Sequence, residues 1–246
     1  MNLLDLPRAY APFTSDVAIQ ASTPIAELLR TGFDPRDPLE PISLGPPSGA
    51  SPNAGRTTHP LLCHATSEAA EIAVARELVR KRYAWRGYRV VETPGSAFPD
   101  ETRASHYLTI VAKSPNATVG TVTLGIDSTH GLLVDEANKR EADRLRARGR
   151  RLCELVRLAV DDGVNSKAVL ASLFQCVYTI GRCMHDLTDV LIEVNPRHVP
   201  FYRRVFGFIC ASEEKICERV GAISVLLSLD ISSLEERFLL PPGVPA

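Results

Sequence analysis

The sequence lacks a long hydrophobic run, although 45% of its 246 residues are hydrophobic. Its longest apolar stretches fall far below the roughly 20 residues that a membrane-spanning helix requires, so we expect no integral membrane segment. The first thirteen residues also lack the basic stretch followed by an apolar stretch that defines a secretory signal peptide. We therefore expect a cytoplasmic protein.

An excess of either charge is missing as well. The chain has 28 Lys and Arg against 29 Asp and Glu, a formal net charge of −1, which argues against a nucleic-acid-binding protein. Its six cysteines form no Cys-x-x-Cys pair and no zinc-ligand spacing. We expect no metal site, and we expect reduced thiols, as is usual in the cytoplasm.

Proline is scarce after residue 60 but common before it. Ten of the 18 prolines lie in residues 1–60, and each proline fixes its φ angle and removes a backbone hydrogen-bond donor. This composition predicts a Pro-rich N-terminal arm over residues 1–60, partly irregular, with one short helix at 23–30. The arm is either a disordered leader or a strap that packs on the domain or on a partner. Residues 61–246 are predicted to form the folded domain.

Helical and strand patterns follow each other along residues 61–246. Apolar spacing and capping residues predict helices at residues 66–87, 136–148, 166–184 and 196–205. Stretches rich in β-branched residues predict strands at 89–92, 106–112, 118–126, 151–160, 189–194 and 222–229, and another just after Gly207. Because strands precede, alternate with and follow helices, the fold class is mixed α/β or α+β.

The strand expected over residues 153–160 carries two charges, on Glu154 and Arg157. Ionised side chains in a buried strand are costly unless they are paired or used. Strand alternation places these two residues on opposite faces, whereas a bulge between them would bring them to one face. The charges are either a structural ion pair or edge-strand charges, or they mark a carboxylate in an apolar cleft that could act as a general base.

A second pattern spans residues 189–208. A strand ends at Asn195-Pro196, a short helix carries Phe201 and Tyr202, and Gly207 allows a tight return into another strand. This order resembles the closing half of the GNAT (N-acetyltransferase) fold. GNAT enzymes that use coenzyme A hold its diphosphate on a Gly-rich loop and a helix N-terminus. The corresponding residues 161–167 contain one Gly and two acids, so the donor is expected to be something other than free coenzyme A.

A more specific resemblance runs from about Ser67 to the end of the chain. It is carried by segments at residues 82–88, 99–101, 105–108, 120–127, 131–135, 145–155, 192–198 and 201–204. These segments resemble the FeeM-type N-acyl amino acid synthases, a GNAT-like branch related to acyl-homoserine-lactone synthases. The lactone synthases tend to have Arg-Leu where this chain has Thr123-Leu124, which argues against lactone formation.

The resemblance implies a fold, a reaction and its partners. The fold would be the GNAT-like acyl-CoA N-acyltransferase fold, with a central twisted mixed sheet flanked by helices. The reaction would move a fatty acyl group from an acyl-carrier-protein thioester to the amino group of an amino acid. The donor would be acyl-4'-phosphopantetheine on acyl carrier protein, with acyl-coenzyme A as the alternative, and no cofactor would be tightly bound. The product would associate with membranes.

Three residues are the candidates for the chemistry. By the resemblance, Glu154 and Arg157 match the family's strand acid and the Arg three residues after it. Glu154 would accept a proton from the attacking amine, and Arg157 would hold a substrate carboxylate or pair with Glu154. Tyr202 would protonate the leaving thiolate, or it is a core aromatic residue. His106 and Tyr107 are expected to pack in the core.

Further candidates would bind the substrates. The substrate-binding candidates are Trp85, Asp100, Asn195, Arg197, His198 and Phe201. The candidates for binding an acidic carrier protein are Arg148, Arg150, Arg151, Arg203 and Arg204. Simpler interpretations stay open: Trp85 as a packing anchor, His198 at a helix start, and the basic run at 139–151 as a solvated helix.

Two alternatives to the favoured function stay open. One is another enzyme, an autoinducer-type synthase or a coenzyme A-dependent acetyltransferase. The other is a catalytically inactive GNAT-like module that binds acyl carrier protein or an acyl ligand.

Overall fold

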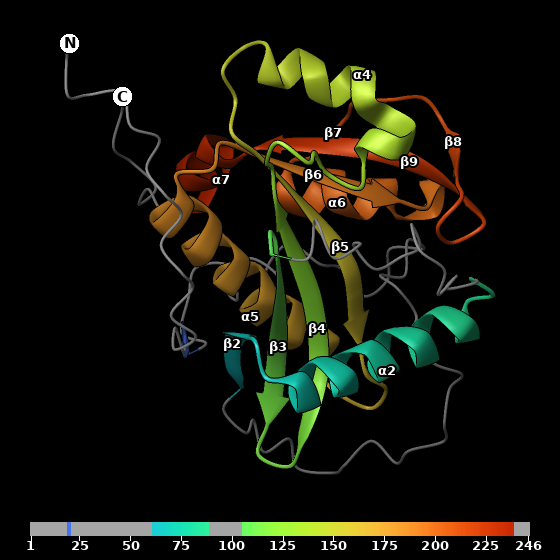
Figure 1. Cartoon of the computed structure of the whole chain (residues 1–246). Helices are drawn as coiled ribbons and strands as arrows, with labels where there is room; N and C mark the ends of the chain where they lie inside the picture. The colour runs from blue at the N-terminus through green and yellow to red at the C-terminus, as the bar shows by residue number, and fades with distance from the viewer. Residues whose placement is uncertain (1–18, 21–60, 89–104, 239–246) are drawn as a thin grey trace.

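A nine-stranded mixed sheet forms the framework of the computed structural model, which describes residues 19–20, 61–88 and 105–238 (Figure 1). Its strands are β1 (Ile19–Gln20), β2 (Leu62–Thr66), β3 (Tyr107–Ser114), β4 (Ala117–Ile126), β5 (Leu152–Val160), β6 (Asp189–Val194), β7 (Ile209–Cys210), β8 (Lys215–Cys217) and β9 (Ala222–Asp230). The order is β1-β2-β3-β4-β5-β6-β9-β7, with β8 paired to β9. Among these strands, only β5 and β6 pair in parallel.

Five α-helices and two shorter helical turns connect the described strands. They are α2 (Ala69–Trp85), α4 (Asp135–Arg146), α5 (Ser166–Tyr178), a π-helical turn (Thr179–Met184), a 3-10 turn (Pro196–His198), α6 (Val199–Phe206) and α7 (Ile231–Phe238). The predicted elements after residue 105 are confirmed within a few residues, and β8 and α7 are additional. The helix expected at 23–30 and the strand expected at 89–92 lie outside the described residues. None of the described helices combines the length and apolar character needed to cross a bilayer.

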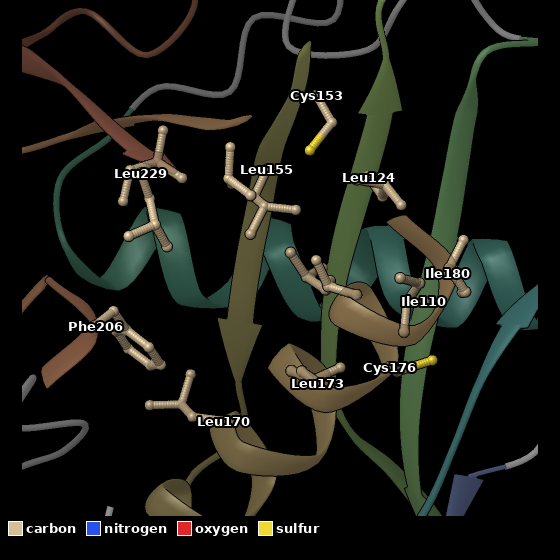
Figure 2. Close-up of a cluster of buried hydrophobic side chains, with 14 of the residues drawn as sticks. Ile110, Leu124, Cys153, Leu155, Leu170, Leu173, Cys176, Ile180, Phe206 and Leu229 are labelled. Atoms are coloured by element: carbon tan, nitrogen blue, oxygen red, sulfur yellow. The ribbon is translucent and has the colours of Figure 1, made fainter. Parts of the chain in front are cut away.

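The main hydrophobic core lies between the sheet and helices α5 and α6. Alternate residues of β5, Cys153 and Leu155, belong to this core together with Leu173 of α5 (Figure 2). Phe206 of α6 stacks on Phe174 of α5 with 4.4 Å between ring centroids. This face is covered along its length, so the period-two pattern of the strands and the 3.6-residue pattern of α5 meet in one apolar layer.

On the opposite face of the sheet, the described helices cover the two ends. At one end, Leu78 and Val79 of α2 pack on Ala159 of β5. At the other end, α4 and the turn before it bury a second cluster around Leu132 and Leu152. Figure 1 shows α2 and α4 at opposite ends of strands β3–β5. Polar residues of these strands therefore occupy the part of the face between the two helices.

A β-bulge interrupts the pairing of β4 with β5. Thr123 pairs with Val156, and Thr121 pairs with Ala159, so Arg157 and Leu158 of β5 together oppose one residue of β4. The extra residue reverses the alternation of β5. Glu154 and Arg157 consequently lie on the same face of the sheet, as the sequence allowed if a bulge separated them.

The first strand belongs to the Pro-rich arm. Ile19 pairs with Cys63 and Gln20 pairs with Leu62, both in β2. Without β1, β2 would be the edge of the sheet and its outer backbone groups would be unpaired. This pairing supports a strap for that part of the arm.

Deletion of residues 1–60 is therefore expected to lower the thermal stability. The lost strand pairing is worth about 1 kcal/mol, or roughly 2–4 °C in melting temperature for a domain of this size. Deletion of residues 1–18 keeps β1 and is the matched control, with a melting temperature near that of the full chain. Equal melting temperatures for both deletions and the full chain would contradict the strap.

Candidate active site

The site lies where two neighbouring strands of the sheet diverge. β5 and β6 pair only from Leu152 to Leu155 on the β5 side. Beyond Leu155 the second half of β5 and the end of β6 line a cavity of about 190 Å³, together with residues of α2, α6 and β9. Five of the predicted site residues line this cavity: Glu154, Arg157, Asn195, His198 and Tyr202.

Glu154 is the most deeply buried ionisable residue of the cavity wall, with no exposed surface. Its carboxylate accepts hydrogen bonds from the backbone N–H of Leu133 (2.7 Å) and of Val134 (2.9 Å), and from the hydroxyl of Tyr107. Burial disfavours the charged form and raises the pKa of Glu154 from 4.5 to about 7, although these hydrogen bonds oppose the rise. At neutral pH the side chain can therefore both accept and release a proton.

Tyr107 reaches Glu154 across a neighbouring strand. Tyr107 of β3 pairs with Gly125 of β4, and Gly125 pairs with Glu154 of β5, so the three residues form one row. A Cβ atom on Gly125 would lie 2.4 Å from the Tyr107 ring. The glycine therefore provides the space in which the phenol crosses to the carboxylate. Tyr107 was expected only to pack in the core, because a tyrosine at the start of an apolar strand gives no sign of a polar partner. In the structure its hydroxyl instead donates to Glu154.

Arg157 occupies the bulge in a left-handed conformation, with φ at +55°. A residue with a side chain rarely adopts this conformation, and such strain is common at functional sites. One of its guanidinium nitrogens lies 3.5 Å from the hydroxyl of Thr123. Burial lowers the pKa of Arg157 to about 10, so the side chain stays a cation at neutral pH.

Tyr202 lines the cavity from α6 and is 6% exposed. Phe201 does not line the cavity; its ring packs edge-on against Tyr202 with 5.3 Å between centroids. Burial raises the pKa of Tyr202 above its ordinary value, so the hydroxyl keeps its proton throughout the neutral range. The aromatic cluster of α6 thus fixes a neutral hydroxyl at the cavity wall.

Asn195 and His198 lie where β6 passes into the 3-10 turn. The Asn195 side chain accepts a hydrogen bond from the backbone N–H of Arg197 (3.2 Å) and donates one to the carbonyl of Ile223 (3.4 Å). It thereby caps the turn and holds it to β9. Burial, together with the charges of Arg86 and Arg197, lowers the pKa of His198 to about 4. The imidazole is neutral at pH 7.

Trp85 lies outside the cavity, at the end of α2, and is 50% exposed. The guanidinium groups of Arg82 and Arg86 lie 5.2 and 6.0 Å from its ring centroid, an arrangement typical of cation–π contacts. These contacts agree with the packing-anchor interpretation and leave its role in substrate binding a prediction. Asp100 lies outside the described residues.

The predicted carrier-binding arginines fall into two groups. Arg203 and Arg204 are exposed on α6, directly after Tyr202. The other three precede β5, at the opposite end of that strand from the bulge: Arg148, Arg150 and Arg151. Of these, Arg150 pairs with Asp189 and with Asp230 (2.6 Å), so part of the basic run serves the fold.

A buried ionic network that the sequence analysis missed supports one wall of the cavity. Arg219, 8% exposed, donates to the carbonyl of Leu133 (2.7 Å) and pairs with Glu136 (2.8 Å) and Glu193. Glu193 also accepts a hydrogen bond from Asn138 (2.9 Å). The turn before α4 is thus held by Glu154 through its N–H groups and by Arg219 through a carbonyl. In the sequence, the only local sign of this network is Glu193, an acid within the apolar strand β6.

The loop after β5 carries acidic side chains that pair with α2. Lys81 lies 3.0 Å from Asp161, and Arg82 pairs with Asp162. These contacts place two carboxylates just before the N-terminus of α5. Across the described ranges, no group of three or more His, Cys, Asp or Glu side chains is arranged to hold a metal ion.

Solved structures share this architecture. The structure of FeeM, an N-acyl amino acid synthase from uncultured soil microbes, matches with a TM-score of 0.66 and 26% identity, over 76% of this chain and 98% of that one. Escherichia coli ElaA matches with a TM-score of 0.46 and 11% identity, over 65% and 90% of the two chains. An acyl-CoA N-acyltransferase from Pseudomonas aeruginosa matches with a TM-score of 0.43 and 12% identity, over 68% of this chain and 97% of that one. None of the curated protein sequences matches the chain.

A mixed sheet whose parallel strands diverge around a cavity, together with the likeness to FeeM, defines a GNAT-like N-acyltransferase. The family model described as N-acyl amino acid synthase FeeM matches residues 74–230. The chain belongs to this family. The expected GNAT-like fold and acyltransferase class are thereby confirmed.

Substitution of Gly125 by Ala tests the row of β3–β5. The new Cβ would collide with the Tyr107 ring, so the phenol must move away from Glu154. We expect acyltransferase activity to fall by up to about 100-fold, as misplacement of a catalytic group can cost. The substitution Tyr107→Phe, which only removes the hydroxyl, should also lower the acyltransferase activity.

Gly181→Ala is the matched control for that substitution. A Cβ there would meet its nearest neighbour, Leu187, at an ordinary 3.4 Å. Both glycine variants are compared with the natural chain in steady-state activity and in melting temperature. An unchanged activity for Gly125→Ala would show that the Tyr107–Glu154 contact has no part in the reaction.

Proposed function

We propose that this chain transfers a fatty acyl group from an acyl-carrier-protein thioester to the α-amino group of an amino acid, giving an N-acyl amino acid. One observation carries the proposal: a buried carboxylate with a pKa near 7 forms part of the wall of a cavity between diverging strands. Membership in the FeeM family supports the same reaction.

In the proposed reaction the amine nitrogen attacks the thioester carbonyl carbon. A C–N bond forms, the C–S bond breaks, and the amine loses a proton to the carboxylate of Glu154, directly or through a water molecule. The leaving thiolate takes a proton from the hydroxyl of Tyr202, which its surroundings keep protonated. Glu154 then passes its proton by way of solvent to the Tyr202 phenolate, which restores both residues, and the thiol and the amide are the products.

The diverging strands suit a phosphopantetheine arm. Where β5 separates from β6, backbone groups of both strands lose their ladder partners and can pair with the amide groups of an extended ligand. A backbone N–H at the bulge can donate to the oxyanion of the tetrahedral intermediate. The cavity could then hold the thioester beside Glu154 while the fatty chain extends along the apolar wall.

The charges around the site favour a carrier protein over free coenzyme A. A diphosphate at the N-terminus of α5 would lie beside the carboxylates of Asp161 and Asp162, and the cations Lys81 and Arg82 at that place are already paired with them. An acidic carrier surface can instead meet exposed cations, either Arg203 and Arg204 of α6 or, in the group before β5, Arg148 and Arg151. We place the enzyme in the cytoplasm, which agrees with its six free cysteines.

Glu154 predicts a pH dependence. Below pH 7 its carboxyl is mostly protonated and cannot accept the amine proton, so kcat/KM for the amino acid should rise as the pH increases through about 7. A second rise at higher pH reflects deprotonation of the amine itself. Glu154→Gln should lose the first rise, keep the second, and be slower by about 10²- to 10⁴-fold.

A second variant separates chemistry from folding in that experiment. A glutamine amide would turn an N–H donor toward the backbone N–H of Leu133 or Val134, which destabilises the turn. Glu154→Asp keeps the charge but shortens the side chain, so it should keep a pH-dependent rise at reduced rate. Melting temperatures of all variants are measured alongside, and a Glu154→Gln enzyme with natural rate and pH profile would contradict the assignment.

Mass spectrometry tests the proposed function as a whole. The purified chain is incubated with long-chain acyl carrier proteins and a mixture of amino acids, and lipid extracts of expressing cells are analysed in parallel. We expect new masses equal to a fatty acid plus an amino acid minus water, absent from cells that express Glu154→Gln. No such mass, with acetylation from acetyl-coenzyme A instead, would overturn the proposal.

A further inference from the structure

Two arginines converge on one histidine at the cavity. Arg86, at the end of α2, lies 3.3 Å from Nε2 of His198, and the Nε–H of Arg197 donates to the same atom at 3.2 Å. Arg197 also donates to the hydroxyl of Tyr88 (3.2 Å), and its guanidinium lies 6.0 Å from the Tyr88 ring centroid. Arg86, Tyr88 and His198 all line the cavity. We call Arg86, Tyr88, Arg197 and His198 the arginine cluster.

The arginine cluster has an unusual charge balance. Several other arginines of the described residues that have restricted exposure pair with carboxylates: Arg82 with Asp162, Arg146 with Asp127 and Asp135, Arg150 with Asp189, and Arg219 with Glu193. In the arginine cluster, Arg86 is half-buried and Arg197 is exposed at the rim. For Arg86 and Arg197, no carboxylate within the described ranges lies at ion-pair distance. Two guanidinium groups held close together without an anion repel each other, and a bound anion would relieve that repulsion.

The state of His198 agrees with this geometry. An imidazole nitrogen that accepts hydrogen bonds from two cations must carry a lone pair, so His198 is neutral and acts as a support for the arginines. Burial and the two arginines lower the pKa of His198, which also indicates a neutral imidazole. His198 thus holds the two guanidinium groups together without neutralising either of them.

We propose that Arg86 and Arg197 bind the α-carboxylate of the acceptor amino acid. The inference rests on the proposed function and deepens it: the acceptor must be an amino acid, and an amine without a carboxylate is a poor substrate. Guanidinium groups bind carboxylates through paired, charge-assisted hydrogen bonds. The acceptor amine can then point along the cavity toward Glu154, which lines the same cavity as Arg86.

The position of the cluster favours the acceptor over the donor. Arg86 directly follows α2, and α2 packs on the face of the sheet that carries the side chains of Glu154 and Arg157. The amine that gives its proton to Glu154 must approach from that face. Its carboxylate, attached to the adjacent carbon, therefore belongs on that side as well.

Kinetics with matched acceptors test this inference. The natural chain is compared with Arg197→Gln, Arg86→Gln and, as the control, Arg144→Gln, which removes the same charge from an exposed position on α4. The acceptors are an amino acid identified by mass spectrometry and the amine that its decarboxylation would give. For the two cluster variants we expect KM for the amino acid to rise about 10- to 100-fold, the loss of a hydrogen bond to a charged group.

Three outcomes of these kinetic measurements would support or overturn the inference. Support requires that the natural chain prefers the amino acid over its amine, that this preference collapses in the cluster variants, and that KM for acyl carrier protein stays unchanged. An equal loss for both acceptors overturns it. A rise in KM for acyl carrier protein alone also overturns it and assigns the cluster to the phosphodiester of the phosphopantetheine arm.

A binding measurement separates this inference from the proposed function. Calorimetric titration of the amino acid into the natural chain and Arg197→Gln needs no turnover. If no amide forms but the amino acid binds the natural chain and not the variant, the proposed reaction fails and the carboxylate site stands. If amide forms while the variant binds and uses the amino acid normally, the site fails and the reaction stands. Melting temperatures confirm that each variant is folded.

Discussion

The burial of one carboxylate organises this site. Glu154 has no exposed surface, and an ionised group in such a place is stable only if donors surround it. The donors come from separate parts of the chain: the Tyr107 hydroxyl on β3 and two backbone N–H groups at the start of α4. The carboxylate therefore joins the sheet to the turn before α4, and Gly125 is required between them because any larger residue would block the phenol.

The bulge and the divergence of β5 from β6 give this carboxylate a cavity. Without the extra residue at Arg157, the second half of β5 would continue its alternation and turn that cation to the face covered by α5. Without the divergence, backbone pairing would fill the gap between the strands. Both irregularities fall within a few residues of Glu154. The local disruption of the sheet and the burial of the acid therefore belong to the same site.

The sequence predicted the regular elements better than the contacts that cross them. Apolar periodicity located β5 and α5, and in the structure the side chain of Asn165 caps α5 by accepting a hydrogen bond from the backbone N–H of Ala168. The shared face of Glu154 and Arg157 was foreseen only as conditional on a bulge, because strand alternation does not encode one. Tyr107 and Arg219 were missed because their partners lie far away in the sequence. The role of Arg150 depends on Asp189, 39 residues later, which no local pattern shows.

The charges of the cavity match those of a zwitterion. In the proposed reaction the ammonium group of the acceptor faces Glu154 and its carboxylate faces the arginine cluster. The ammonium loses its first proton to solvent, and Glu154 takes the second as the C–N bond forms, a transfer for which a carboxylate of ordinary pKa is a weak base. Raising the pKa of Glu154 from 4.5 to about 7 makes it a stronger base by roughly 3 kcal/mol. The burial that disfavours ionisation of Glu154 is thus what makes this carboxylate basic enough to serve.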